Sequence, residues 1–206
     1  PTYKFGLNSN FDLASIEKAI PMKGYLFSGL LKADLQTSGR MSFIENEQYD
    51  MMIAQGQVDL KDVMLDGDSM DFPMEIPFGS LSINPQVANL RDTKILIGQS
   101  DLSFSGDIDN LMAYVLSDSL LKGNLRMSSH YLNLNEISGE EETAADEEAP
   151  ADTSLMEVIR LPENIAFNLK ATIDSLIYDD MVNTNVIGDL NLDKGKAELK
   201  DFSMKM

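Results

Sequence analysis

The sequence predicts a mainly β fold with unusually long strands. In several segments apolar and polar residues alternate for about a dozen residues, and a period of two is that of a strand with one apolar face. Only three short segments have the character of helices, which are too few to cover a sheet of eight or more strands. Typical strands have only about 5–6 residues, so the apolar faces of these strands need an extensive cover.

Six strands are expected in the first 108 residues. They are residues 3–8 ("YKFGLN"), Gly24–Thr37, Gly56–Leu65, Ile76–Ile83, Ala88–Ile97 and Asp101–Ile108. In Gly56–Leu65 the alternation changes phase near Asp62, which indicates a β-bulge. The dipeptides Ser-Gly at 38–39 and Asp-Gly at 66–67 are turn signals.

Three short helices are expected between these strands. The first, Phe11–Ile20, has Asn10 as its N-cap and ends at Pro21. The other two are Phe43–Met52 and Asn110–Ser117.

The C-terminal part of the chain predicts further long strands. Leu121–Leu134 alternates until its phase slips near Leu132, which indicates a second bulge or the end of the strand. Two more alternating runs follow on either side of a turn at Asp179-Asp180, and Lys-Gly at 194–195 is another turn signal. If the two runs form an antiparallel hairpin, their apolar phases lie on one side of the sheet. We expect this shared apolar surface to include Phe167, Leu169, Ile173, Val186 and Leu190.

The composition limits the partners of the protein. The 206 residues carry a formal net charge of −18, which argues against nucleic acid and against electrostatic docking on anionic headgroups. Seven of the 34 acidic residues fall in the stretch "EEETAADEEAPAD" at 140–152, and we expect residues 139–153 to be a flexible acidic linker. Otherwise we expect 1–206 to be a single domain of a longer protein, whose membrane anchor or export signal lies outside the sequence.

Candidate catalytic and metal-binding groups are few. The chain has no cysteine and only one histidine, His130, which falls on the polar side of its strand and is interpreted as a surface residue. The stretch "DGDSMD" at 66–71 resembles the start of a calcium loop, but Asp71 stands where an EF-hand needs glycine. We therefore expect no enzymatic activity, no cofactor and no metal site.

Periodicity leaves two architectures open. A second sheet can cover the apolar face and form a closed β-sandwich. Alternatively, one strongly curved sheet can form a trough whose apolar lining is covered partly by lipid. Both bury one face of each strand, so alternation alone does not separate them.

The order of several motifs resembles the C-terminal region of the AsmA family. The resemblance begins near Phe11 and extends to the end of the chain. It rests on "GQVDLKDVMLDG" at 56–67, "GQSDLSFSGDIDNLMAYVL" at 98–116 and "LKGNLRMSSHYLNLNEI" at 121–137, followed by the acidic stretch and the two C-terminal strands. It favours a curved, groove-like sheet of long antiparallel strands with two or three short helices.

The resemblance also implies a function. Proteins similar to AsmA and TamB are anchored in the inner membrane of Gram-negative bacteria, reach into the periplasm and support outer-membrane biogenesis. They are considered bridge-like carriers that move phospholipid along β-grooves, and they bring no catalytic residues. The leading hypothesis is thus a phospholipid-binding segment that continues into neighbouring segments of the same protein. The alternative is a structural or protein-interaction sandwich without lipid.

Overall fold

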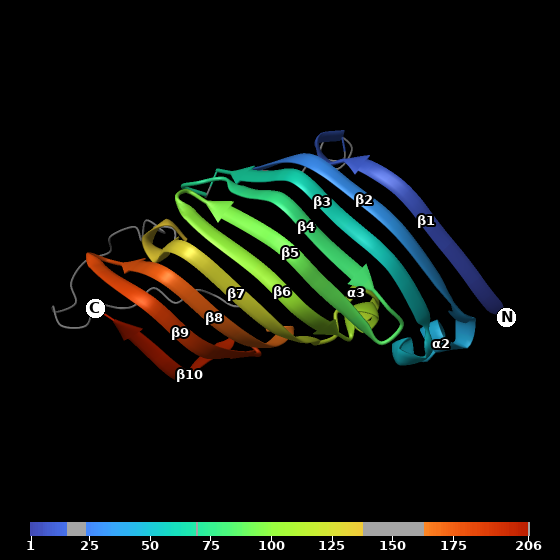
Figure 1. Cartoon of the computed structure of the whole chain (residues 1–206). Coiled ribbons are helices and arrows are strands. Elements are labelled where there is room, and N and C mark those ends of the chain that lie inside the picture. Colours follow the sequence, from blue (N-terminus) through green and yellow to red (C-terminus); the bar gives the residue numbers. More distant parts are fainter. Residues whose placement is uncertain (16–23, 69, 138–162, 206) are drawn as a thin grey trace, which may run out of the picture.

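A single ten-stranded sheet forms most of the protein. The computed structural model describes residues 1–15, 24–68, 70–137 and 163–205. The strands lie side by side in the order of the sequence, β1 to β10 (Figure 1). Their bounds are β1 Thr2–Asp12, β2 Tyr25–Arg40, β3 Ile53–Gly67, β4 Met74–Ile83, β5 Val87–Ile97, β6 Ser100–Asp109, β7 Leu121–Asn133, β8 Ile165–Tyr178, β9 Met181–Asp193 and β10 Lys196–Lys205.

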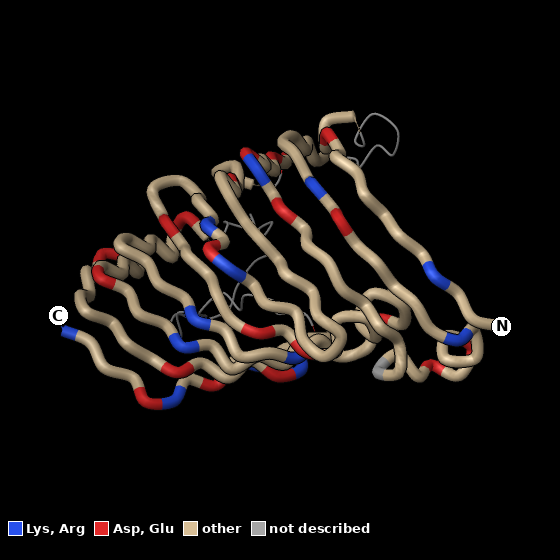
Figure 2. The backbone as a smooth tube through the Cα atoms, turned by 45° about the vertical axis from the view of Figure 1, so that its right-hand side comes forward, with Lys and Arg blue, Asp and Glu red and all other residues tan. Residues whose placement is uncertain are grey.

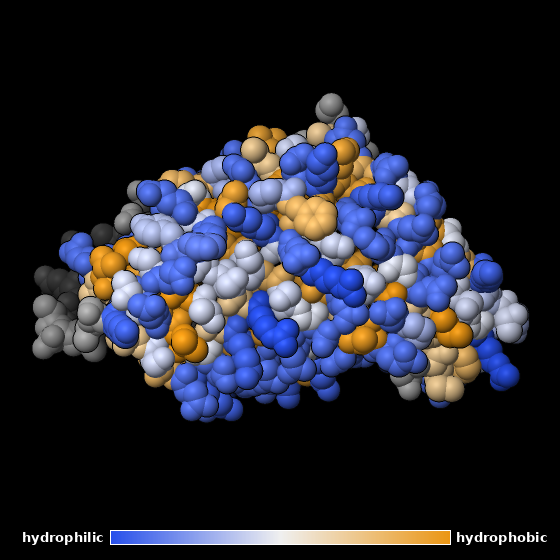
Figure 3. Space-filling view, in the orientation of Figure 1, coloured by the Kyte–Doolittle hydropathy of each residue, from blue (hydrophilic) through white to orange (hydrophobic). Residues whose placement is uncertain are grey.

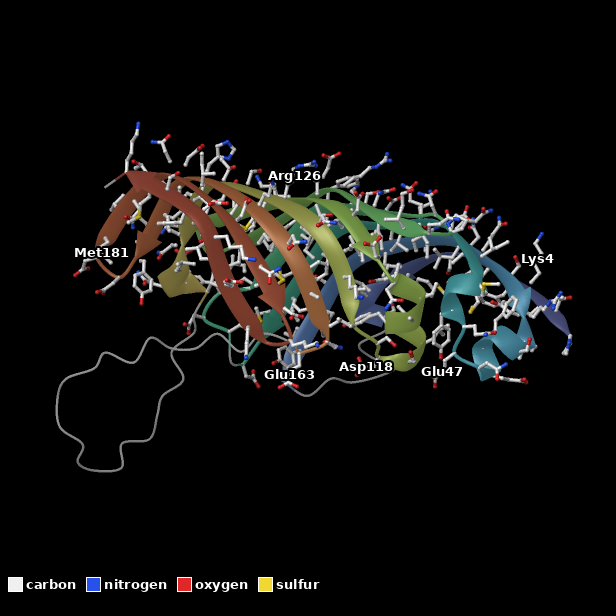
Figure 4. All side chains as sticks on the ribbon, turned by 90° about the horizontal axis from the view of Figure 1, so that it is seen from below. Lys4, Glu47, Asp118, Arg126, Glu163 and Met181 are labelled. Carbon is white, nitrogen blue, oxygen red and sulfur yellow. The ribbon has the colours of Figure 1, made fainter. Side chains whose placement is uncertain are left out.

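The prediction of a mainly β, curved sheet of long strands is confirmed. The sheet does not close into a barrel, and the described residues form no second sheet against it, so the sandwich alternative is wrong for this part of the chain. Seen from below, the sheet curves like an open trough, with helices on its concave side (Figure 4).

One strand pair departs from the expected antiparallel arrangement. All neighbours are antiparallel except β7 and β8, which are parallel. A parallel pair needs a connection of about a dozen residues or more, and only the long connection between Asn133 and Ile165 joins these two strands. The residues predicted to be an acidic linker, 139–153, lie in this connection and outside the described residues.

Bulges bend the sheet along one line. At Asp62 the φ angle is 49° and the β2–β3 register shifts between Ser28 and Leu30, which confirms the predicted bulge. A second bulge at Asp92, with φ of 45°, shifts the β5–β6 register. Because Lys61 pairs with Phe78, and Phe78 with Lys94, both bulges lie at one level of the sheet. Bulges increase local twist and bend, so this line of bulges contributes to the curvature.

The first helix begins later than expected, and its predicted end at Pro21 lies outside the described residues. β1 continues through the predicted N-cap Asn10, and the next helical turn begins only at Leu13. Asp12 is the residue that caps it, because its carboxylate accepts the Ala14 N–H at 3.1 Å and the Ser15 hydroxyl at 3.3 Å. Asn10 does not cap the helix, because β1 still pairs with β2 through Asp12. A short polar side chain can act as the N-cap only at the residue where the preceding strand ends and the helix begins.

The remaining predicted helices and turns are partly confirmed. The segment expected as Phe43–Met52 forms α2 (Met41–Glu45) and η1 (Tyr49–Met51), while α3 spans Leu111–Ser117. The turn expected at 38–39 is wrong, since β2 runs through it. The turns at 179–180 and 194–195 are present, and β7 ends at Asn133 before η2 (Leu134–Glu136).

Replacing Gly106 with alanine should lower the free energy of unfolding by about 3 kcal/mol. Gly106 has a φ of 146°, and a Cβ there would overlap the carbonyl oxygen of Asn124 on the neighbouring strand. Gly6→Ala is the matched control, because the nearest atom to its Cβ would be 3.9 Å away. Urea unfolding followed by circular dichroism measures both variants, and equal midpoints would contradict the expectation.

Candidate functional site: an apolar trough

Two rows of residues, apolar except for Ser9 at the β1 end, cross the whole sheet on one face. Pairing registers connect the members of each row from β1 to β10. The first apolar row is Ser9, Ala33, Val58, Leu81, Leu90, Gly106, Leu125, Leu169, Leu190 and Leu199. The second apolar row is Leu7, Leu35, Gly56, Ile83, Ala88, Ile108, Gly123, Phe167, Leu192 and Ala197. Neither row contains a charged residue, so they form a continuous uncharged strip across ten strands.

The residues between these rows, on the opposite face, are all polar. This polar row is Asn8, Asp34, Gln57, Ser82, Asn89, Asp107, Asn124, Asn168, Asn191 and Glu198. Side-chain amides donate along it from Asn8 to Asp34 at 3.1 Å, from Asn168 to Asn124 at 3.0 Å and from Asn191 to Asn168 at 2.9 Å. If one strand shifted by one residue against its neighbour, its apolar side chains would move to the polar face and its polar side chains to the apolar face. The hydrogen bonds of the polar row and the packing of the apolar rows therefore favour the same register.

The convex face is exposed to solvent and carries both positive and negative residues. Figure 3 shows it as mostly hydrophilic, with separate hydrophobic side chains. Positive and negative residues are interspersed along its strands (Figure 2), and Lys170 lies 3.9 Å from Asp189. The polar contrast between the two faces identifies the concave face as the candidate site.

Two hydrophobic clusters occupy parts of the trough. One joins η1 and α3 through Tyr49, Met52 and Ala113, with α2 residues packed against them. Beside it lies a cavity of about 250 Å³, lined by Tyr49 of η1, by the start of α3, by the adjoining ends of β4, β5 and β6, and by the loop 84–86. The other cluster centres on Leu102, Leu132, Ile173 and Val186, and Leu134 of η2 and the following Ile137 pack against it. Of the described helices, α2 packs against β2, α3 against β7 and η2 against β8.

The five residues predicted to share a surface lie on this concave face. The register places Leu169 opposite Leu190 and Ile173 opposite Val186, as the hairpin requires. They differ in access, however. Ile173 and Val186 are only 5% and 3% exposed within the second cluster, whereas Phe167, Leu169 and Leu190 are half-buried and line the trough.

Sequence reasoning missed the apolar residues at the two ends of the trough. Phe5 on β1 and Leu199, Phe202 and Met204 on β10 are exposed. Residues 3, 5 and 7 alternate with polar neighbours, and this signal was present in the sequence. On β10 a bulge at Asp201, with φ of 44°, interrupts the alternation and hides the pattern.

Side chains replace backbone bonds where β6 and β7 separate. The Asp101 carboxylate accepts the backbone N–H groups of His130 and Tyr131, both at 3.0 Å, and lies 3.2 Å from the His130 Nδ1. The buried Ser100 hydroxyl accepts the Asn133 N–H at 3.0 Å and donates to Glu136 at 2.9 Å. These bonds satisfy backbone groups of β7 that no longer pair with β6, and they hold η2 over the trough.

Partial burial of Asp101 raises the pKa of its carboxyl, but the hydrogen bonds from Tyr131 and His130 outweigh burial and leave the pKa below its ordinary value. Above the unfolded pKa of about 3.9 the bonded carboxylate contributes fully to stability, and this contribution fades as pH falls through the lower folded pKa.

Asp101→Asn should therefore lower the free energy of unfolding by about 1 kcal/mol at pH 7, because the amide oxygen is a weaker acceptor than the carboxylate. The difference in the free energy of unfolding between this variant and the parent protein should become smaller at about pH 3. Urea unfolding at both pH values measures this, with Asp174→Asn, on an exposed residue of β8, as the control. The same difference in the free energy of unfolding at both pH values would contradict a stabilising role for the ionised Asp101 carboxylate.

The described residues offer little else for chemistry. The side chain of His130 is 87% exposed and contacts Asp101. Among the hydrogen bonds of the described residues, none joins the His130 ring to a serine or threonine hydroxyl, as a catalytic triad would require. No group of three or more histidine, cysteine or acidic residues in the described ranges could hold a metal ion. In the stretch 66–71, which resembles the start of a calcium loop, the Asp66 carboxylate accepts the backbone N–H of Gly67 at 2.9 Å. None of the described helices has the length and apolar character to cross a membrane.

Comparison with protein-family models, curated proteins and solved structures found no match to this chain.

Proposed function

We propose that the trough holds the acyl chains of phospholipid, without chemistry of its own. The observation that carries this proposal is the pair of apolar rows, which cross all ten strands without a charge. Each CH₂ group removed from water contributes about 0.8 kcal/mol, so an acyl chain along these rows would be bound by burial alone. A charged lining would oppose such binding, because an unpaired charge against hydrocarbon is costly.

The dimensions of the trough fit more than one lipid. Ten strands at a spacing of about 4.8 Å give a strip of roughly 43 Å along the curved sheet. The hydrocarbon of one bilayer leaflet is about 15 Å deep, half of the usual 30 Å. An extended acyl chain would therefore cover only part of the strip, and lipids could follow one another across the strands.

The open side of the trough leaves the headgroups in water. The apolar rows provide no charged group to recognise phosphate, and the net charge of −18 gives no attraction to anionic headgroups. Binding of this kind depends on acyl chains, so we expect little selectivity among phospholipid headgroups.

The cellular setting in this proposal comes from the resemblance to the AsmA family. In this proposal, the chain is a periplasmic segment of a protein that is anchored in the inner membrane of a Gram-negative bacterium. The anchor belongs to the longer protein in this proposal, and the trough continues from its β10 end into neighbouring segments of the same protein. The segment would then support outer-membrane biogenesis by conducting phospholipid.

Gentle purification and organic extraction test the proposal. We expect mass spectrometry of the extract to show phospholipid bound to the purified chain. The lipid should be replaceable by a fluorescent fatty-acyl probe, whose emission rises in an apolar site. A lipid-free extract together with no binding of the probe would contradict the proposal. It would favour the alternative of a protein-interaction domain, which the exposed β10 strand also supports.

A further inference from the structure

The two edges of the open sheet differ in how well they are protected. Strand edges present unpaired backbone groups, and proteins usually guard them with lysines, prolines or bulges. β10 contains three lysines, and its register shifts twice after Lys200. β1 contains a single lysine and no proline, and it pairs with β2 from Thr2 to Asp12 without a shift. Among the described residues, the outer edge of β1 is thus a long, regular and unguarded edge.

We propose that this edge is a self-association interface, at which β1 of one chain pairs antiparallel with β1 of a second copy. The pairing has a two-fold axis at Asn8. Such an interface is isologous, because each chain contributes the same strand. This proposal concerns the sheet edge and does not depend on lipid binding.

Charge selects the register. With Asn8 opposite its own copy, Lys4 faces Asp12 of the second copy, and symmetry produces this pair twice. Opposite charges across antiparallel strands are stabilising, whereas like charges are destabilising. Shifting the axis to Leu7 would place Lys4 opposite Asn10 and lose both pairs. Asp12 already caps the following helical turn, but a carboxylate has further acceptor positions for a lysine.

The same register matches the two faces of the strands. On the concave face, Phe5 lies opposite Phe11 of the second copy, and Leu7 lies opposite Ser9. Phe5 is 58% exposed in the single chain, so the aromatic pair would cover it. Aromatic pairs of this kind stabilise neighbouring strands.

Pairing at Asn8 also continues the rows that cross the sheet. Asn8 is the terminal member of the polar row and donates its amide to Asp34, which leaves its own oxygen free to accept from the second copy. A two-fold axis perpendicular to the sheet keeps both concave faces on one side. The dimer would therefore be a sheet of twice the width with one continuous apolar trough.

Sedimentation of the purified chain with charge variants tests the interface. We expect a monomer–dimer equilibrium at micromolar concentrations. Lys4→Glu places like charges opposite each other twice and should raise the dissociation constant about tenfold. Lys61→Glu, on β3, changes the net charge equally and should leave it unchanged. Adding Asp12→Lys to Lys4→Glu restores opposite charges and should recover most of the affinity.

A single cysteine tests the register directly, because the natural chain has none. Asn8→Cys places two thiols opposite each other at the axis, within reach of a disulfide, so mild oxidation should link two chains. Asn10→Cys is the control: its two copies would be separated by roughly 13 Å along the strands and should stay unlinked.

Three results would overturn the proposal. They are a chain that remains monomeric at all concentrations, equal cross-linking at positions 8 and 10, and a charge-reversed double variant that does not recover association although circular dichroism shows it folded. Association through β10 would leave both the Asn8→Cys and the Asn10→Cys chains unlinked, which is the second of these results.

Discussion

Val186→Asp should lower the free energy of unfolding by about 3–5 kcal/mol, which is much of the stability of an ordinary domain. Val186 is 3% exposed and packs with Leu102, Leu132 and Ile173. A carboxylate at this place would lose its water without gaining a partner among these side chains. It would either remain charged at high cost or take up a proton, and both destabilise the fold.

The next residue on the same strand provides a matched control. Ile187 points to the convex face and is 52% exposed, so Ile187→Asp should change stability by less than about 1 kcal/mol. Urea unfolding of both variants, followed by circular dichroism, gives the comparison. Similar midpoints for the two variants would show that the cluster beneath η2 is not a core.

Alternation in the sequence was enough to predict the strands and their apolar faces. It works because the side-chain period of a strand is fixed and does not depend on what covers the face. For the same reason it could not separate a trough from a sandwich. The bulge at Asp62 was predictable because the apolar phase changes around it. A comparable change between Leu90 and Ile95 marks the bulge at Asp92, which was overlooked.

Long-range contacts explain why the candidate site was predicted only in part. The sequence treats Leu169 and Val186 alike, since each lies on the apolar phase of its strand. In the structure, Leu134 and Ile137 after β7 pack against the cluster that contains Val186, and among the described residues Leu169 is not part of that cluster. That difference depends on hydrogen bonds from Ser100 and Gln99 to Glu136, which hold η2 in place. Periodicity carries no information about such contacts. The parallel pairing of β7 with β8 was missed for a similar reason.

Leu169→Asp should remove most of the bound phospholipid while the domain stays folded. Leu169 is half-buried in the first apolar row, so an aspartate there can reach water at the open side when lipid is absent. With lipid present, the same charge would lie against acyl chains, where an unpaired carboxylate is strongly unfavourable. We expect at least a tenfold loss of lipid per protein, equivalent to about 1.4 kcal/mol.

Two further variants separate lipid binding from folding. Leu199→Asp, at a row position that is 54% exposed, should cost almost no stability and should still lower lipid occupancy at the β10 end of the trough. Thr172→Asp adds the same charge to the convex face of β8 and should leave lipid unchanged. Lipid mass spectrometry and thermal melts on the same preparations decide between the outcomes. If Leu169→Asp and Leu199→Asp remain folded and keep their full lipid content, the apolar rows do not bind lipid. If only Leu169→Asp unfolds, Leu199→Asp still tests the rows, because its side chain supports no part of either buried cluster.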